Sequence, residues 1–173
     1  MIIDLSGIIK DDEDVITVSG KTELPSMDFL GEEFKFDDGL TVDGKITNNS
    51  KSLLFTAVVS GNVTVHCARC TEEIKQPVKF KVSEYLVREE QAENMGDDDD
   101  AVVFDGEEID IDDIIINNFL LNTSGKYLCR EDCRGLCPKC GKNLNLGDCG
   151  CPDDEIDPRW AALAEIMKNS ETE

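Results

Sequence analysis

Residues 63–82 read V-T-V-H-C-A-R-C-T-E-E-I-K-Q-P-V-K-F-K-V, two β-type runs that flank a pair of cysteines. Residues 63–65 and 78–82 alternate apolar or β-branched residues with polar ones, which is typical of strands with one buried face. The intervening pair, Cys67 and Cys70, therefore lies in the turn between two strands. We expect this hairpin tip to present two thiolates, because backbone N–H groups in such a turn can donate to sulfur.

The β-type pattern covers most of residues 33–87, and turn residues interrupt it. Apolar and β-branched runs predict further strands at residues 2–5, 15–19, 34–36, 40–46, 53–59 and 102–104. Turn signals separate the central ones at Asp38-Gly39, Asp43-Gly44, Asn48-Asn-Ser50 and Ser60-Gly-Asn62. Short strands between such turns predict an antiparallel β-sheet or a small open barrel.

Two helices complement the predicted sheet, so the expected fold class is α+β. Residues 110–121 begin with acidic side chains, which suit the positive end of a helix dipole. Their apolar stripe, which should pack on the sheet, comprises Ile111, Ile114, Ile115 and Phe119. The run of isoleucines taken alone also fits a strand. Asp157-Pro158 opens a short last helix. We expect Trp160 to anchor that helix on the body or on the cysteine-rich segment, the alternative being contact with a partner.

The composition excludes several classes of protein. The 173 residues carry 17 Lys or Arg against 38 Asp or Glu, a net charge of −21, and residues 89–113 hold 13 acidic side chains and no basic one. Phosphate backbones repel such a chain, so direct nucleic-acid binding has to be local or absent. No apolar run approaches the ~20 residues of a membrane span. Residues 1–10 lack the features of a secretory signal, so we expect a cytoplasmic protein without membrane contact.

Six of the eight cysteines lie within residues 129–151, which read C-R-E-D-C-R-G-L-C-P-K-C-G-K-N-L-N-L-G-D-C-G-C. Without export, the thiols are in a reducing compartment, where this spacing favours metal binding over disulfides. Eight thiols match two tetrahedral Zn²⁺ sites of four ligands each. The sequence therefore predicts two zinc sites.

The spacing divides the cysteines into two sets. The knuckle group consists of Cys137, Cys140, Cys149 and Cys151, a C-x-x-C pair followed closely by C-G-C. The remaining four form the hairpin group, which would staple the C-terminal segment to the sheet: Cys67, Cys70, Cys129 and Cys133. Two alternatives stay open. In the first, only one zinc binds, and Cys67 and Cys70 are unpaired reduced thiols. In the second, the pairings within the cluster are exchanged, because spacing does not define connectivity.

The predicted organisation has two parts. Residues 1–122 form a β-rich body that carries an acidic loop at 89–113 and a helix at about 110–122. Residues 123–173 form the cysteine-rich zinc module and its C-terminal helix.

The sequence offers little for catalysis. The only histidine, His66, is expected at the surface or in contact with a ligand rather than as a ligand itself. Closed four-cysteine sites leave no open position for water, and neither a phosphate-binding loop nor a nucleophile elbow occurs. We expect no enzyme and no small-molecule substrate. The alternative is a thiol redox protein that uses Cys67 and Cys70, although such pairs sit at a helix N-terminus after a strand.

Four separated motifs occur at residues 65–70 (V-H-C-A-R-C), 121–122 (L-N), 129–145 and 157–163 (D-P-R-W-A-A-L). Together and in this order they resemble the YceD family, the "large ribosomal RNA subunit accumulation protein" group of bacteria and plastids. The resemblance implies a non-enzymatic factor that is needed for normal accumulation of 23S rRNA.

Under this resemblance we expect a factor for large-subunit biogenesis. The negative charge favours a basic ribosomal protein or a pre-ribosomal particle as the partner, with the acidic body shielding that protein before assembly. The alternative is direct contact with rRNA through the basic side chains of the zinc module, which are Lys126, Arg130, Arg134, Lys139 and Lys142.

Overall fold

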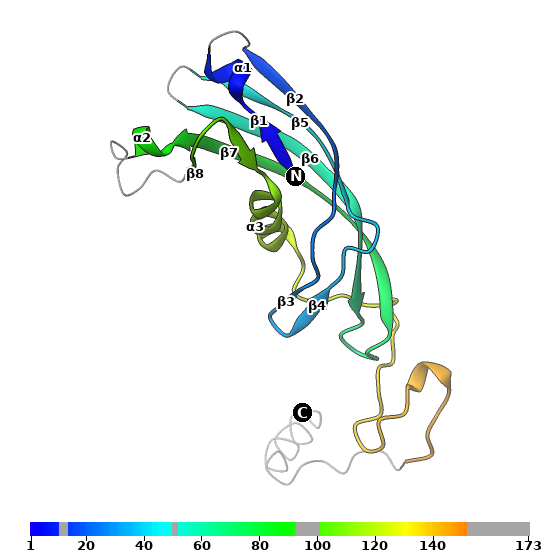
Figure 1. The fold of residues 1–173 in the computed structure, drawn as a ribbon. Coiled ribbons are helices and arrows are strands. Elements are labelled where there is room, and N and C mark those ends of the chain that lie inside the picture. The colour runs from blue at the N-terminus through cyan, green and yellow to red at the C-terminus, as the bar shows by residue number, and fades with distance from the viewer. Residues whose placement is uncertain (11–13, 50–51, 93–100, 152–173) are drawn as a thin grey trace, which may run out of the picture.

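The computed structural model describes residues 1–10, 14–49, 52–92 and 101–151, and it is a mixed α+β fold built on one long curved sheet (Figure 1). In chain order the elements are β1 (Ile2–Asp4), α1 (Ser6–Ile9), β2 (Val15–Thr22), β3 (Met27–Phe29), β4 (Glu32–Phe34), β5 (Leu40–Asn48), β6 (Leu53–His66), β7 (Glu73–Arg88), α2 (Glu89–Ala92), β8 (Val102–Phe104), β9 (Glu108–Asp110), α3 (Asp112–Asn122) and the 3-10 helix η1 (Leu144–Leu146).

The main sheet has five strands in the order β2-β5-β6-β7-β8. The first four pair antiparallel, and β8 joins β7 in parallel with Leu86 opposite Val102. Strand β1 pairs with β9, and β3 pairs with β4. The predicted α+β class with an antiparallel sheet is therefore confirmed, and a parallel strand is added at one edge. The sheet is open, with β2 and β8 at its two edges.

Two predicted turns are wrong, because the glycines concerned lie inside strands. Gly44 is opposite Ala57 within β5 and β6, and Gly61 is opposite Leu40. A Cβ atom on Gly44 would lie 2.5 Å from the Cβ of Ala57, and one on Gly61 would lie 2.7 Å from Cδ2 of Leu40. These glycines therefore allow neighbouring strands to approach closely instead of reversing the chain. As a result β6 runs without a break to His66, at the cysteine hairpin.

The hydrophobic core lies between the sheet and α3, which crosses the concave face of the sheet (Figure 1). The predicted apolar stripe of α3 is confirmed, because Ile111, Ile114, Ile115 and Phe119 are each at most 4% exposed. The Phe119 ring meets three others edge-on or tilted, with centroid distances of 5.3 Å to Phe34, 5.2 Å to Phe36 and 6.1 Å to Phe80. This ring cluster joins α3 to β4 and to β7, the strand that follows the cysteine hairpin.

Part of the predicted organisation lies outside the described residues. The predicted last helix, with Trp160, lies entirely outside the described residues, and so do residues 93–100 of the acidic stretch. The described remainder of residues 89–113 differs from the expected loop, since it forms α2, β8, β9 and the start of α3. Within the part of the chain that is described, no helix is long and apolar enough to cross a membrane.

Candidate metal centres

The hairpin group begins at the turn between β6 and β7. The N–H of Cys67 donates to the carbonyl of Glu72 (2.8 Å), and the N–H of Thr71 donates to the carbonyl of Cys67 (2.9 Å). This turn holds Cys67 and Cys70 at the end of two long paired strands. The predicted hairpin position of the C-x-x-C pair is therefore confirmed, and it differs from the helix N-terminus that a thiol redox centre uses.

The C-terminal segment returns to this turn and brings two more cysteines to it. The N–H of Ala68 donates to the carbonyl of Tyr127 (2.8 Å), and Nη1 of Arg69 donates to the carbonyl of Cys133 (2.9 Å). The Sγ atom of Cys67 then lies 3.8 Å from that of Cys133. The Sγ atom of Cys70 lies 3.7 Å from that of Cys129, although the two residues are 59 positions apart in the sequence.

These sulfur separations fit a tetrahedral metal site. A Zn–S distance of about 2.3 Å in a tetrahedron places neighbouring sulfurs about 3.8 Å apart. The observed 3.7 and 3.8 Å agree with this value, whereas a disulfide would need about 2.05 Å. All four ligand atoms lie within 4.8 Å of one another, and Cys67, Cys70 and Cys133 are buried. A buried set of four soft sulfur donors suits Zn²⁺.

The surroundings of the hairpin group favour some thiolates over others. Burial disfavours the Cys67 thiolate, but backbone N–H groups of Cys129, Arg69 and Cys70 donate to it and bring its pKa down to about 6. The side-chain amide of Asn145 donates to Cys133, with Nδ2 3.3 Å from Sγ, and is the main cause of a lowered pKa there. For Cys70, the backbone donor at Glu72 is outweighed by burial and by the neighbouring sulfurs, so the pKa rises to about 12. Crowded thiolates repel one another, and a divalent cation would offset that repulsion.

The knuckle group consists of Cys137, Cys140, Cys149 and Cys151, whose ligand atoms also lie within 4.8 Å of one another. Its first turn closes where the N–H of Gly141 donates to the carbonyl of Cys137 (2.8 Å), and Gly141 has φ +73°, a left-handed conformation that glycine adopts without strain. Backbone N–H groups of Cys140 and Lys139 donate to Cys137 and lower its pKa to about 6. Cys140 is exposed, so this group is more open to solvent than the hairpin group.

The segment that carries these cysteines has almost no hydrophobic core. Of residues 129–151, only Cys133, Gly135 and Cys137 are buried, and Leu146 is exposed. The segment contacts the body next to Gly135, where the N–H of Leu136 donates to the carbonyl of Arg69 (3.1 Å). An added Cβ atom on Gly135 would lie 3.0 Å from that carbonyl oxygen, so the two backbones approach closely. Such a segment needs another source of stability, and a bound structural metal supplies it in small domains of this kind.

The region that contains the cysteines also matches a known protein family. A family model described as "Large ribosomal RNA subunit accumulation protein YceD" matches residues 55–167. The chain belongs to the YceD family. The matched range contains all eight cysteines, so both groups lie within the part of the chain that carries the family pattern.

Relatives of this YceD chain occur in bacteria and in a plastid. An uncharacterised protein of Mycobacterium tuberculosis is 33% identical over 130 residues, which cover 74% of this chain and 62% of that protein. The uncharacterised protein YlbN of Bacillus subtilis is 24% identical over 86% of both chains. The Arabidopsis thaliana protein named "Large ribosomal RNA subunit accumulation protein YCED homolog 1, chloroplastic" is 26% identical over 77% of this chain and 50% of its own length. No solved structure matches the chain significantly.

The structure of this YceD chain gathers the sulfurs into the same two sets that spacing suggested. Zinc binding by these sets remains a prediction. His66 lies outside both groups: its Nδ1 is 3.3 Å from Oε1 of Glu32, and its backbone N–H donates to the same oxygen (2.6 Å). The basic residues proposed for RNA contact are at the exposed surface of the C-terminal segment: Lys126, Arg130, Arg134, Lys139 and Lys142.

Sequence reasoning missed the contacts that link the two groups. Asn145 lies in the loop of the knuckle group, yet its amide donates to Cys133 of the hairpin group. Its Oδ1 accepts hydrogen bonds from the N–H of Arg134 (2.9 Å) and from Nη2 of Arg130 (2.7 Å). An Asn between cysteine pairs carries no signal for such a role, because asparagine is common in turns. Only the folded arrangement identifies Asn145 as a hydrogen-bond donor to a candidate metal ligand.

Proposed function

We propose that this chain is a non-enzymatic factor for ribosome biogenesis that supports accumulation of 23S rRNA and assembly of the large subunit in the cytoplasm. The observation that carries the proposal is the family match over residues 55–167, under a description that names large ribosomal RNA subunit accumulation. The name of the Arabidopsis relative agrees with it. The chain spans only 62% of the length of the mycobacterial relative, so this proposal concerns the part of such a protein that the chain matches.

The two cysteine groups have a structural role in this proposal. The hairpin group and the knuckle group each hold one Zn²⁺ in this proposal. The metal of the hairpin group joins the C-terminal segment to the body formed by residues 1–122, and the metal of the knuckle group closes the loop between Cys137 and Cys151. Sulfur separations of 3.7 and 3.8 Å and the small number of buried residues in 129–151 support this division. Four thiolates fill the coordination of a zinc ion, so each site would supply stability rather than a reactive water.

The partner we propose is a basic protein of the large subunit. The net charge of −21 supports it, because a strongly negative protein attracts a positively charged partner and speeds its association. The charges of the C-terminal segment disfavour the direct-RNA alternative. Arg130 lies 3.4 Å from a carboxylate oxygen of Asp132, and Arg134 lies 2.6 Å from one of Asp148. Cations that already have carboxylate neighbours contribute less to phosphate binding.

A pull-down from growing cells tests the proposed function. Tagged full-length protein is recovered with and without RNase treatment, and the bound protein and RNA are both identified. We expect basic large-subunit proteins to stay bound after RNase treatment and to be released as salt is raised, because exposed charge pairs are screened. Recovery of no large-subunit component would contradict the proposal.

Filter binding separates the protein partner from direct RNA contact. Fragments of 23S rRNA are titrated with the wild-type protein and with a variant in which the five basic residues of the C-terminal segment are reversed in charge. Under the proposal both proteins bind RNA weakly and equally. Tight binding that the reversal abolishes would establish the rRNA alternative instead.

A further inference from the structure

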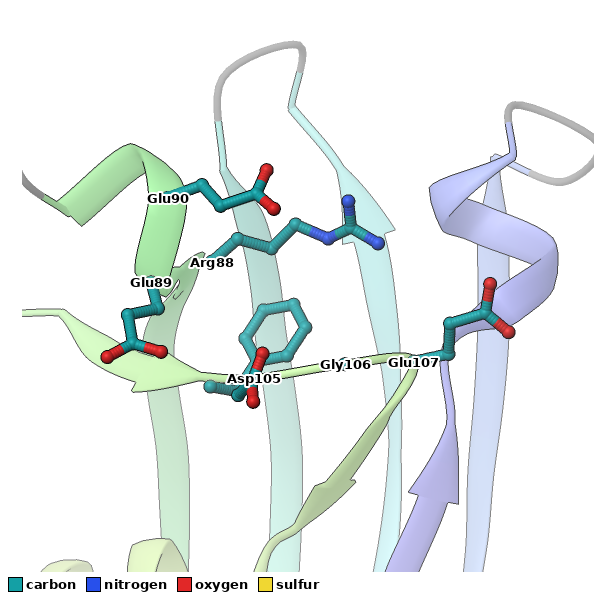
Figure 2. A pocket seen from close by; sticks show the side chains of 7 residues that line it. Arg88, Glu89, Glu90, Asp105, Gly106 and Glu107 are labelled. Carbon is teal, nitrogen blue, oxygen red and sulfur yellow. The ribbon is translucent and has the colours of Figure 1, made fainter.

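A cavity of 420 Å³ opens at the carboxyl end of the parallel pair β7 and β8 (Figure 2). This end of the sheet is far from the turn between β6 and β7 that carries Cys67 and Cys70 (Figure 1). Because two parallel strands end at the same edge, the residues that follow them are brought together there. The chain that follows β7 provides Glu89 and Glu90 in α2, and the chain that follows β8 provides Asp105 and Glu107. The floor includes the buried ring of Phe104.

The cavity has an excess of negative charge around one guanidinium group. Four carboxylates line it against the single cation of Arg88, whose side chain extends across it (Figure 2). Glu107 is partly neutralised by Lys10, with Nζ and Oε1 3.0 Å apart. Glu90 and Asp105 have no ion pair with any residue that the structure describes.

Arg88 adds an observation independent of the carboxylates. Its Nε atom is buried and finds no acceptor among the described residues. A buried donor without an acceptor is costly, and most such donors in proteins are paired. The guanidinium group of Arg88 lines the cavity and adds hydrogen-bond donors to its negative charge, so a ligand that satisfies both carries an acceptor next to a cation.

The neighbouring strand offers a place for an extended chain. Strand β8 is an edge of the main sheet, and no described strand pairs with its other side. Val103, at its centre, is 51% exposed. Edge strands with open backbone groups accept an added strand from a partner, and side-chain pockets next to the edge provide the specificity.

We propose that β8 and this cavity dock an extended lysine- or arginine-rich segment of a protein partner. The segment pairs with β8, places one basic side chain among Glu90, Asp105 and Glu107, and offers a backbone carbonyl to the guanidinium group of Arg88. This inference rests on the proposed function, because it locates the basic partner on the body. RNA fits the site poorly, since its phosphates would face four carboxylates. A free metal cation fits poorly as well, since Arg88 extends into the cavity.

Peptide binding to the full-length protein tests the site. The probe is a fluorescent peptide that alternates lysine with valine, and its affinity is measured by anisotropy at low salt. The site variant combines Glu90→Lys with Asp105→Lys. The matched control combines Glu23→Lys with Asp28→Lys, two exposed residues at and before β3, and changes the net charge equally. We expect about tenfold weaker binding for the site variant and less than about twofold for the control.

Further measurements address backbone pairing and folding. The same peptide with alternate N-methylated amides keeps its charge but cannot pair as a strand, so it should bind about tenfold more weakly. If the lysine variant does not fold, as judged by circular dichroism, Glu90→Gln with Asp105→Asn takes its place.

Different outcomes refute different claims. Equal losses in the site and control variants, or unchanged binding of the methylated peptide, would overturn the docking site while leaving the proposed function intact. An RNA oligonucleotide that binds this site more tightly than the peptide would also overturn it. If the pull-down from cells recovers no large-subunit component, the proposed function fails, whatever the peptide does.

Discussion

Asn145→Asp should loosen zinc at the hairpin group selectively. The change keeps the shape of the side chain and keeps Oδ1, which accepts from the N–H of Arg134 and from Arg130. It removes only the Nδ2 donor, which lies 3.3 Å from Sγ of Cys133, and it places a negative charge next to a thiolate.

The expected magnitude follows from that single hydrogen bond. A hydrogen bond to a charged group contributes about 1.5–3 kcal/mol. Because ~1.4 kcal/mol corresponds to a factor of ten, the metal affinity should fall by about 10- to 100-fold, the range found for residues that orient metal ligands. Asn145 is only partly buried, so solvent weakens the effect and the lower end, about tenfold, is expected.

Cadmium NMR can measure the two groups separately, because each tetrathiolate site gives its own resonance. A chelator is titrated into the cadmium-loaded protein, and the loss of each resonance is followed. Asn117→Asp on the exposed side of α3 provides a control with the same change in charge. In Asn145→Asp, the resonance of the hairpin group should be lost at a chelator concentration about tenfold lower than in the wild type. In the control, that concentration should be unchanged. Equal affinities in the variant and the wild type would refute a positioning role for Asn145.

Three further predictions concern stability. Gly44→Ala should lower the free energy of unfolding in urea by about 1–3 kcal/mol, because its Cβ would overlap Ala57, whereas a gain in stability would indicate a turn instead of a continuous strand. Phe119→Ala should cost about 3–5 kcal/mol by the same assay, since its ring contacts three others, and a loss below ~1 kcal/mol would contradict the core described. Removal of zinc should abolish hydrogen-exchange protection in residues 129–151 while the amides of β5 and β6 stay protected; simultaneous loss in both regions would show that the metals support the whole fold.

Short-range patterns in the sequence predicted much of the fold. Alternation of apolar and polar residues indicated the strands around the cysteine hairpin, and helical spacing indicated the buried face of α3, because both patterns repeat within a few residues. The same patterns failed at Gly44 and Gly61. A glycine that ends a strand and one that admits a close neighbour look alike until the neighbouring strand is known.

For the candidate metal centres, the sequence alone determined that eight cysteines at short spacings suit two four-sulfur sites, since ligands two residues apart can reach one ion. It left open which pairs combine. The tertiary structure decided this by bringing Cys70 to 3.7 Å from Cys129, and it also decided that Asn145 contacts Cys133 and that β7 and β8 end at a common acidic cavity. These contacts join residues distant in the chain, so they depend on strand register and packing, which no local spacing encodes.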